Sequence, residues 1–210
     1  MGSEIVLAIT GSSGMIYGQR FLMRAVEHFQ RVHLVISPTV PILMKQELGL
    51  LLSAEEPDPL ALLPSEAPPS LKEQIAERVR GYHYMDFQAP FASGSNAPEG
   101  MAIVPCSQGT LARIVAGVSD NLITRAADVV LKERRRLVVV PRETPLSAIH
   151  LRTWLALTEA GGVVMPASPA FYHRPRTIAE LVDSIVERAL AHLGVPKEQL
   201  KIRWGEEILR

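Results

Sequence analysis

Short unbroken apolar runs alternate along the chain with longer segments in which apolar residues recur every three or four positions. The first run, Ile5 to Ile9, is long enough for a parallel strand buried on both faces, and it stops at Thr10-Gly11. From Ile16 to Val26 the apolar spacing is that of an amphipathic helix, which we expect to reach about Gln30. A strand, a glycine turn and a helix in this order are the opening of a nucleotide-binding α/β unit.

The same alternation predicts the remaining elements. We expect further strands at 32–36, 82–87, 101–104, 137–140 and 163–165, the second of them short and irregular, and helices at 37–48, 71–80, 111–115, 121–136, 146–159 and 178–193. Prolines and acidic residues between 53 and 70 cannot support a long regular element, so we expect an exposed connection there and not a domain boundary. The pattern predicts a single α/β domain over residues 1–210 with a mostly parallel sheet.

Composition narrows the class of protein. With 210 residues, 47% of them hydrophobic, the chain carries more apolar surface than one domain buries, which predicts a homo-oligomer. Lys and Arg equal Asp and Glu at 22 each, so no global charge favours nucleic acid or an anionic membrane. Cys106 is the single cysteine, which excludes an internal disulfide and a multi-cysteine metal site. We expect no signal peptide and no membrane helix, and therefore a cytoplasmic protein.

Glycines and hydroxyl side chains gather at two strand-to-helix junctions. Gly11, Ser12 and Ser13 follow the first strand, and Ser107-Gln108-Gly109-Thr110 follows the strand at 101–104. Backbone N–H groups at the start of a helix, with hydroxyls beside them, suit an anion or a cofactor phosphate. Two alternatives stay open, namely that the glycines only make a tight turn and that Ser107 is an ordinary helix cap.

The first junction departs from the dinucleotide fingerprint. Its glycines fall at Gly11, Gly14 and Gly18, which is not the spacing G-x-G-x-x-G. The second strand ends at Ser37, where a dinucleotide fold usually offers Asp or Glu to the ribose. A nicotinamide dinucleotide is therefore disfavoured.

Further candidates follow the later strands. Arg142 and Glu143 come directly after the strand at 137–140, between two prolines that stiffen the turn, where open α/β sheets place their ligands. The alternative is a surface ion pair between these two residues. Tyr172 and His173 lie in a loop expected at the same edge, and a lone histidine is more often structural than catalytic. The tail from about residue 196 carries Trp204, an anchor that we expect to dock on the body or on a neighbouring subunit.

These motifs together resemble one family. The matching stretches are T-G-S-S-G-M-I-Y-G (10–18), A-S-G-S (92–95), P-C-S-Q-G-T (105–110), N-L-I-T-R-A-A-D-V-V-L-K-E-R-R (121–135), V-P-R-E-T-P (140–145), F-Y-H-R-P (171–175) and R-W-G (203–205). Their ordered set, which covers nearly the whole chain, resembles the UbiX-type flavin prenyltransferases, once described as aromatic-acid decarboxylases. The resemblance implies a Rossmann-like (flavodoxin-like) three-layer sandwich, usually assembled as a dodecamer built from trimers. It also implies FMN and dimethylallyl phosphate as ligands, and a prenylated flavin made for UbiD-type decarboxylases.

The resemblance assigns roles to residues of this chain. It implies FMN contacts at Gly11, Ser12, Ser13, Ser37, Ser107, Gln108, Gly109, Thr110 and Arg142. It implies that Arg125, Lys132, Tyr172 and Arg188 hold the prenyl phosphate, that Phe87, Ala92, Ser93 and Gly94 form the prenyl pocket, and that Ser13 and Glu143 are catalytic. Family examples carry Ala at the position of Ser12 and Trp at the position of Phe87. Phe87 keeps an aromatic face, but Phe is a weaker partner for positive charge than Trp.

Cationic side chains in place of a metal–carboxylate cluster predict a reaction that needs no divalent metal. Three other functions stay open. A phosphopantothenoylcysteine decarboxylase shares the fold, but its usual Pro-Ala-Ser-Ala-Asn-Thr loop is replaced here by Ala92-Ser93-Gly94-Ser95. A direct aromatic-acid decarboxylase is the older description of close relatives. A non-catalytic FMN-binding protein needs the cofactor contacts but not Glu143 with the cationic set.

Overall fold

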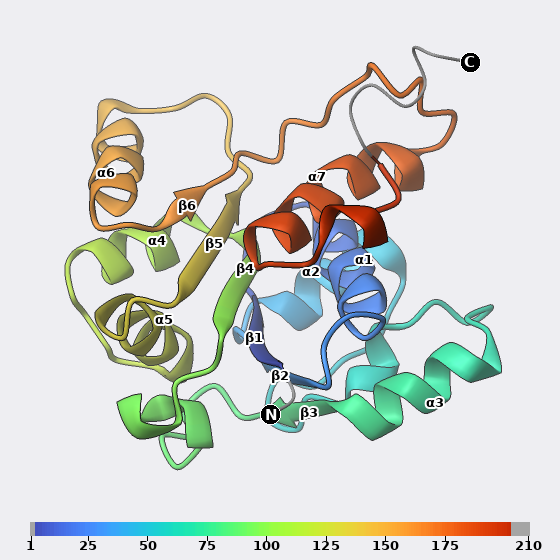
Figure 1. Ribbon diagram of the computed structural model, residues 1–210, viewed down its shortest axis with the longest axis horizontal. Helices are drawn as coiled ribbons and strands as arrows, with labels where there is room; N and C mark the ends of the chain where they lie inside the picture. Colours follow the sequence, from blue (N-terminus) through green and yellow to red (C-terminus); the bar gives the residue numbers. More distant parts are fainter. Residues whose placement is uncertain (1–2, 203–210) are drawn as a thin grey trace.

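A computed structural model describes residues 3–202 of the chain (Figure 1). Six parallel strands form one sheet in the order β3-β2-β1-β4-β5-β6. The strands are β1 Glu4–Ile9, β2 Arg31–Ile36, β3 Val79–Tyr82, β4 Gly100–Cys106, β5 Arg136–Pro141 and β6 Val163–Val164. The helices are α1 Met15–Ala25, α2 Val40–Leu48, α3 Pro69–Arg78, α4 Gln108–Val115, α5 Leu122–Lys132, α6 Ala148–Glu159 and α7 Ile178–His192. This is the doubly wound Rossmann order, and the predicted α/β sandwich is confirmed.

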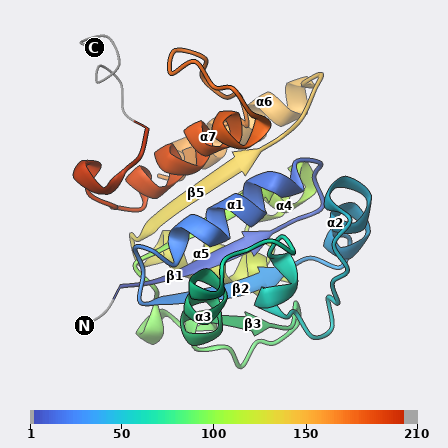
Figure 2. The ribbon, with the colours of Figure 1, turned by 90° about the vertical axis from the view of Figure 1, so that its right-hand side faces the viewer.

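Two hydrophobic cores fill the space on either side of the sheet. Alternate residues of β1 point to opposite faces: Ile5, Leu7 and Ile9 pack in the core under α1, α2, α3 and α7, whereas Val6 and Ala8 pack in the core under α4, α5 and α6. Figures 1 and 2 show α1 and α7 lying together over one face. Burial on both faces explains why the central strands read as continuous apolar runs.

Several predicted elements were placed wrongly at their ends, among them the helix predicted at 121–136, which ends at Lys132, and the helix predicted at 71–80, which ends at Arg78. The first helix ends at Ala25 and not near Gln30, because the N–H groups of Gln30 and Arg31 already donate to the carbonyl of Ser3. The edge strand is Val79–Tyr82 and not 82–87, where the chain makes tight turns. Helix α3 runs directly into this strand, which pairs with β2 through residues 32–35. Only that pairing decides where the helix stops.

The C-terminal segment begins against α1 and α7. Leu200 is buried in the core on that side, and the backbone N–H of Lys201 donates to Glu187 of α7 at 2.8 Å. The predicted anchor at Trp204 lies outside the described residues, so its docking stays a prediction.

Candidate active site

The two glycine and hydroxyl junctions meet where the strand order reverses, between β1 and β4. Thr10, at the end of β1, joins them directly. Its N–H and its hydroxyl each lie 3.1 Å from the carbonyl oxygen of Pro105, and its Oγ1 accepts the N–H of Ser107 at 2.7 Å. Sequence reasoning missed Thr10, because only the adjacency of two strands far apart in the chain reveals its role.

The loop after β5 closes onto the first junction. Ser12 Oγ donates to the carbonyl oxygen of Arg142 at 2.8 Å, and Arg142 Nε donates to the carbonyl oxygen of Ser13 at 2.9 Å. The loop after β2 also comes close, since a Cβ added to Gly11 would lie 2.1 Å from Thr39 Oγ1. Thr39 Oγ1 in turn lies 3.3 Å from Ser37 Oγ. We call the assembled set the cradle; it comprises Gly11, Ser12, Ser13, Ser37, Ser107, Gln108, Gly109, Thr110 and Arg142.

The second junction presents donors at the start of α4. Ser107 is the N-cap, and its Oγ accepts the N–H of Thr110 at 3.3 Å, so the ordinary capping role is present. The backbone N–H groups of Gln108 and Gly109 precede the first intrahelical hydrogen bond and are open to a ligand. Gln108 Nε2 is buried and has no hydrogen-bond partner in the described part of the chain. Orphaned donors beside a capped helix start suit the phosphate and carbonyl oxygens of a flavin nucleotide.

A carboxylate already occupies the start of α1. Gly14 is the N-cap of that helix, with φ of 109° and no side chain that can cap. Glu47 of α2 supplies the missing acceptor: its Oε2 takes the N–H groups of Gly14 at 2.9 Å and of Met15 at 2.8 Å. The expectation that this helix start offers free N–H groups was therefore wrong for these two. Sequence reasoning missed Glu47, since nothing local marks a contact across 33 residues.

Glu143 is half-buried beside the cradle. Its Oε1 accepts the N–H of Thr144 at 3.1 Å, and the guanidinium of Arg142 turns away to Ser13. Within residues 3–202 no ion pair joins Arg142 to Glu143, so the alternative of a surface pair between them was wrong. Among the residues that the structure describes, no cation is therefore paired with this carboxylate at the edge of the cradle.

A second group of predicted residues lies along α5. The loop after β3 packs on this helix: Arg125 Nε donates to the carbonyl oxygen of Ala92 at 2.9 Å, and Lys132 lies beside Gly94, where an added Cβ would be 2.4 Å from Nζ. Arg125 also pairs with Asp128 at 2.9 Å, and Lys132 pairs with Glu133. We call this set the α5 group; it comprises Phe87, Ala92, Ser93, Gly94, Arg125 and Lys132.

The predicted phosphate-binding residues lie in two separate places in the structure. Tyr172 and Arg188 line a cavity of about 410 Å³ beside the end of β6, together with Ser168 and Ser184. Arg188 belongs to α7, which covers one face of the sheet, whereas Arg125 and Lys132 belong to α5, which covers the other. One copy of the chain therefore brings Tyr172 together with Arg188 but does not bring the full cationic set together.

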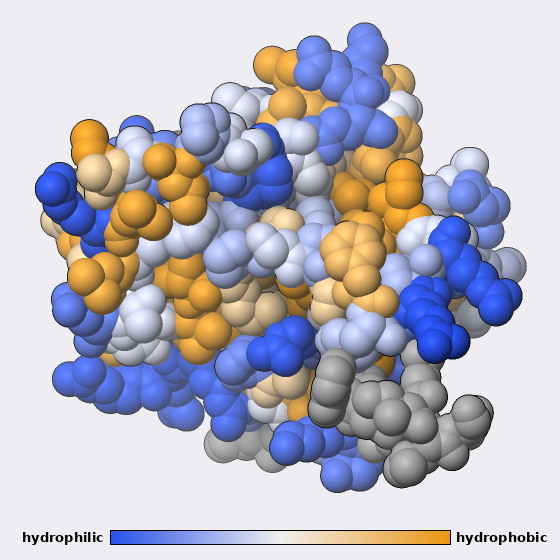
Figure 3. Space-filling model, turned by 90° about the horizontal axis from the view of Figure 1, so that it is seen from above, coloured by the Kyte–Doolittle hydropathy of each residue, from blue (hydrophilic) through white to orange (hydrophobic). Residues whose placement is uncertain are grey.

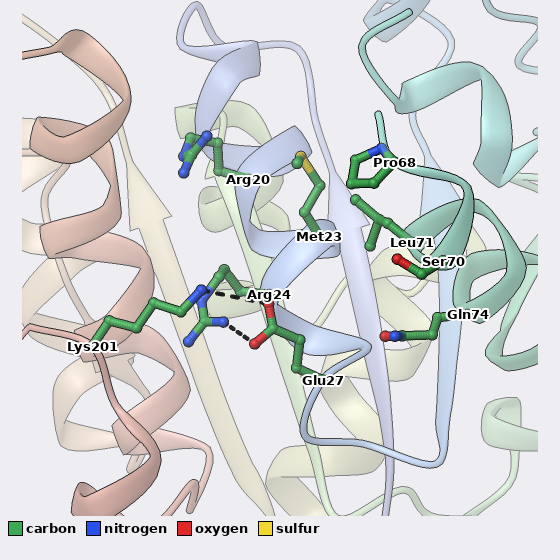
Figure 4. Close-up of a pocket in the computed structure, with 9 residues that line it drawn as sticks. All are labelled: Arg20, Met23, Arg24, Glu27, Pro68, Ser70, Leu71, Gln74 and Lys201. Atoms are coloured by element: carbon green, nitrogen blue, oxygen red, sulfur yellow. Dashed lines mark hydrogen bonds and ion pairs between the residues drawn. The ribbon is translucent and has the colours of Figure 1, made fainter. Parts of the chain in front are cut away.

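Other features of the described residues give no alternative active site. A cavity between α1, α3 and the C-terminal segment is lined by Arg20, Arg24 and Lys201 among others, but by none of the predicted site residues (Figure 4). Cys106 is fully buried, and burial raises the pKa of its thiol, which makes it a poor nucleophile. Between residues 3 and 202 no cluster of three metal-ligating side chains occurs. No helix there is both long and apolar enough to cross a membrane.

The chain is similar to known flavoproteins over its length. The model of the Flavoprotein family matches residues 1–190. The flavin prenyltransferase UbiX of Pseudomonas aeruginosa is 45% identical over 206 residues, which are 98% of this chain and 96% of that protein. The crystal structure of AnUbiX (PadA1) in complex with FMN and dimethylallyl pyrophosphate is 38% identical and superimposes with a TM-score of 0.78, covering 97% of this chain and 98% of that one.

A dodecameric FMN-dependent UbiX-like decarboxylase from Escherichia coli O157:H7 is 36% identical, with a TM-score of 0.75, covering 91% of this chain and 95% of that one. The resemblance predicted from the motifs is thereby confirmed. The chain belongs to the UbiX-type flavin prenyltransferases, within the Flavoprotein family.

Proposed function

We infer that this chain is a flavin prenyltransferase, which joins the dimethylallyl group of dimethylallyl phosphate to reduced FMN. The observation that carries this inference is the cradle, in which loops after β1, β4 and β5 are tied together by Thr10 and Arg142. Glu143 adjoins it, and within residues 3–202 its carboxylate accepts the N–H of Thr144 and pairs with no cation. A relative 38% identical binds FMN and dimethylallyl pyrophosphate, and this supports the same ligand classes here.

The cradle residues are those that would hold FMN. Ser107 and Thr110 offer hydroxyls, Gln108 offers a buried amide N–H₂ group, and the start of α4 offers backbone N–H groups. There is no room for a side chain at Gly11, because the loop after β2 lies against the turn after β1. When bound and reduced, the flavin supplies a nucleophilic ring nitrogen and a ring carbon to which the prenyl group is joined.

Glu143 and Ser13 handle protons in this proposal. The carboxylate of Glu143 is half-buried and accepts a single described hydrogen bond, from the N–H of Thr144, so an oxygen remains to receive a proton. Ser13 is exposed at the same edge, and its carbonyl is fixed by Arg142. A carboxylate placed beside a departing phosphate is useful as a proton carrier, because an unprotonated carboxylate repels the phosphate.

Arg125, Lys132, Tyr172 and Arg188 would hold the prenyl phosphate. Guanidinium and ammonium groups stabilise the charge that develops on a departing phosphate, and they do so without a metal ion. We therefore propose that the reaction needs no divalent metal. Turnover that EDTA abolishes and magnesium restores would contradict this.

In our proposal, a second copy of the chain places its α5 group beside the cradle of the first copy. Large apolar side chains are exposed on α6, among them Ile149 at 68% and Leu155 at 59%, and in the loop beside α5, where Met85 is 50% and Phe87 45% exposed. Figure 3 shows apolar side chains gathered on the left of the molecule, where α6 lies in Figure 1. Two different patches that cover each other make a head-to-tail contact, which forms a ring such as a trimer when the rotation between copies closes.

A homo-oligomer agrees with the dodecameric relative from Escherichia coli. We propose trimers that assemble into a dodecamer, with the α5 group of one copy beside the cradle of the next. Mixing two impaired variants tests this, one with Glu143→Gln in the cradle region and one with Lys132→Ala in the α5 group, at a dimethylallyl phosphate concentration too low for Lys132→Ala alone to turn over. After subunit exchange at equal amounts, about a quarter of the sites combine two intact halves, and activity should return to that level. No recovery despite proven exchange would contradict a shared site.

The direct experiment follows the mass of the flavin. Purified protein is mixed with reduced FMN and with dimethylallyl phosphate or dimethylallyl diphosphate, and the flavin should gain the mass of one dimethylallyl group. An unchanged flavin with both donors, together with release of carbon dioxide from an aromatic acid or from phosphopantothenoylcysteine, would favour a decarboxylase. FMN binding with none of these reactions would favour a non-catalytic flavin protein.

We also propose which enzymes use the product and where in the cell the reaction takes place. A prenylated flavin serves as a cofactor for UbiD-type decarboxylases, so adding the product to such an enzyme lacking its cofactor should start decarboxylation. We place the enzyme in the cytoplasm, which agrees with the unpaired thiol of Cys106.

A further inference from the structure

Trp154 reaches from α6 into the cradle. Its indole Nε1 donates a hydrogen bond to Oε1 of Gln108 at 3.0 Å, across 46 residues of sequence. Gln108 is the first residue of α4, directly after the N-cap Ser107. The indole ring is partly buried against the core on this side of the sheet, where Leu157 of the same helix is fully buried. Trp154 is therefore held by packing while its N–H group contacts a cradle side chain.

This contact decides how the amide of Gln108 is oriented. An indole N–H only donates, whereas a glutamine amide has an acceptor oxygen at one end and a donor nitrogen at the other. The oxygen must therefore face Trp154, and the N–H₂ group must face away from it. In the described chain that nitrogen, Nε2, is buried and has no hydrogen-bond partner. A buried donor without a partner is unfavourable unless a ligand satisfies it.

We propose that Trp154 is a positioning residue of the flavin site: it fixes the amide of Gln108 so that Nε2 donates to an acceptor atom of bound FMN. The proposal rests on the proposed function, because it takes FMN as the occupant of the cradle. The position of Trp154 on a separate helix matters, since α6 packs against α4 and starts from a well-formed cap. In that cap Ser147 accepts the N–H of His150 at 3.2 Å, and His150 Nδ1 accepts the N–H of Ser147. The indole is thus carried by a rigid element and not by a loop.

A double-mutant cycle separates positioning from packing. Trp154→Phe keeps an aromatic ring and removes the donor, and Gln108→Met keeps a long side chain and removes the amide. Each single change should weaken FMN binding about 3- to 10-fold, the loss of one net hydrogen bond. The double variant should bind no more weakly than Gln108→Met alone, because Trp154 acts only through the amide. Both single variants should also shift the visible absorption of bound FMN in the same direction.

Three outcomes would overturn the positioning role. The first is a Trp154→Phe variant that binds FMN as tightly as the wild type. The second is a Trp154→Phe change that weakens FMN binding equally in the wild-type and the Gln108→Met backgrounds, because such a loss would report packing. Should Trp154→Phe fail to fold, Gln108→Met alone remains informative, and an unchanged FMN affinity in that variant is the third. A wild-type protein that does not bind FMN would overturn the proposed function as well, whereas the outcomes above leave it standing.

Discussion

Two regions of the molecule pair cations with carboxylates in different ways. Between α1 and α7, Arg20 pairs with Asp183 and Arg24 with Glu187, across 163 residues of sequence. The side chains of Arg24 and Glu187 are only 5% and 1% exposed. Along α5 the partners are sequence neighbours, Arg125 with Asp128 and Lys132 with Glu133, and the two cations are 34% and 46% exposed.

The carboxylates around the buried Arg24 are all engaged by the protein itself, whereas Arg24 Nη2 is buried without a hydrogen-bond partner among the described residues. Glu187 accepts Arg24 Nε at 2.7 Å with one oxygen and the N–H of Lys201 at 2.8 Å with the other, and Glu27 receives both Arg24 and Lys201 (Figure 4). Burial alone would lower the pKa of Arg24, but hydrogen bonds and charge from Glu27 and Glu187 together raise it. This network stabilises the fold and has no spare carboxylate oxygen to offer a ligand.

The cations of α5 are held only weakly. Exposed ion pairs between neighbours on one helix contribute little, typically below about 1 kcal/mol, so a phosphate can replace the carboxylate at small cost. In this molecule, burial and sequence separation thus distinguish the cations that join two helices from those that stay exposed beside a neighbouring carboxylate. Each prediction below tests one side of this comparison.

Glu187→Ala should have the largest effect on stability. Removing the carboxylate leaves Arg24 buried without its main partner, which costs about 3–5 kcal/mol. Urea unfolding measures this loss. Glu27→Ala is the matched control, because that carboxylate is 41% exposed and its loss should cost well below about 2 kcal/mol. Equal losses in the two variants would contradict the structural role of the buried pair.

Glu143→Gln should affect chemistry and leave stability and binding alone. Glutamine keeps the size and the hydrogen bond from Thr144 but cannot take up a proton, so turnover should fall by roughly 100-fold or more. FMN affinity should change little, and single-turnover rates with titrated FMN measure both quantities. Normal turnover, or loss of the flavin, would assign Glu143 a structural role.

Lys132→Ala and Arg188→Ala should raise the concentration of dimethylallyl phosphate needed for half-maximal rate. Each removes a charge-assisted phosphate bond of about 1.5–3 kcal/mol, which corresponds to roughly 10- to 100-fold. Unfolding free energy should change by no more than about 0.5 kcal/mol. Lys72→Ala, which removes an exposed cation from α3 whose Nζ donates to the carbonyl oxygen of Ser65, serves as the control and should leave substrate dependence unchanged. A large loss of stability in Lys132→Ala would place that residue with the structural pairs.

His33 should give the smallest effect, as a dependence of stability on pH. The buried ring contacts Tyr82 Oη at 3.0 Å and Glu4 Oε2 at 3.2 Å. Burial lowers the pKa of His33 and outweighs Glu4, which raises it, while Arg31 and Arg80 lower it further. The unfolded chain therefore binds the proton first, so stability should fall as the pH drops below about 6.5, by at most about 1.4 kcal/mol per unit. His33→Phe should flatten this dependence in urea unfolding between pH 5 and 8, and an unaltered slope would contradict it.

The sequence by itself determined which segments become strands and helices in the middle of the chain. Continuous apolar runs mark β1, β2, β4 and β5 because both faces of these strands are buried, and Ser107 marks a helix start because its side chain bonds within three residues. The glycine and hydroxyl positions of the cradle were also identifiable, since they follow strands whose carboxyl ends share one edge of the sheet.

The tertiary structure alone decided the rest. The extent of β3 depends on pairing with β2, and Thr10, Glu47 and Trp154 act on residues 97, 33 and 46 positions away. The separation of Arg188 from Arg125 and Lys132 depends on which face of the sheet each helix covers. Local patterns carry the burial and capping preferences of a segment, whereas contacts between segments distant in sequence arise only when the chain folds and brings them side by side.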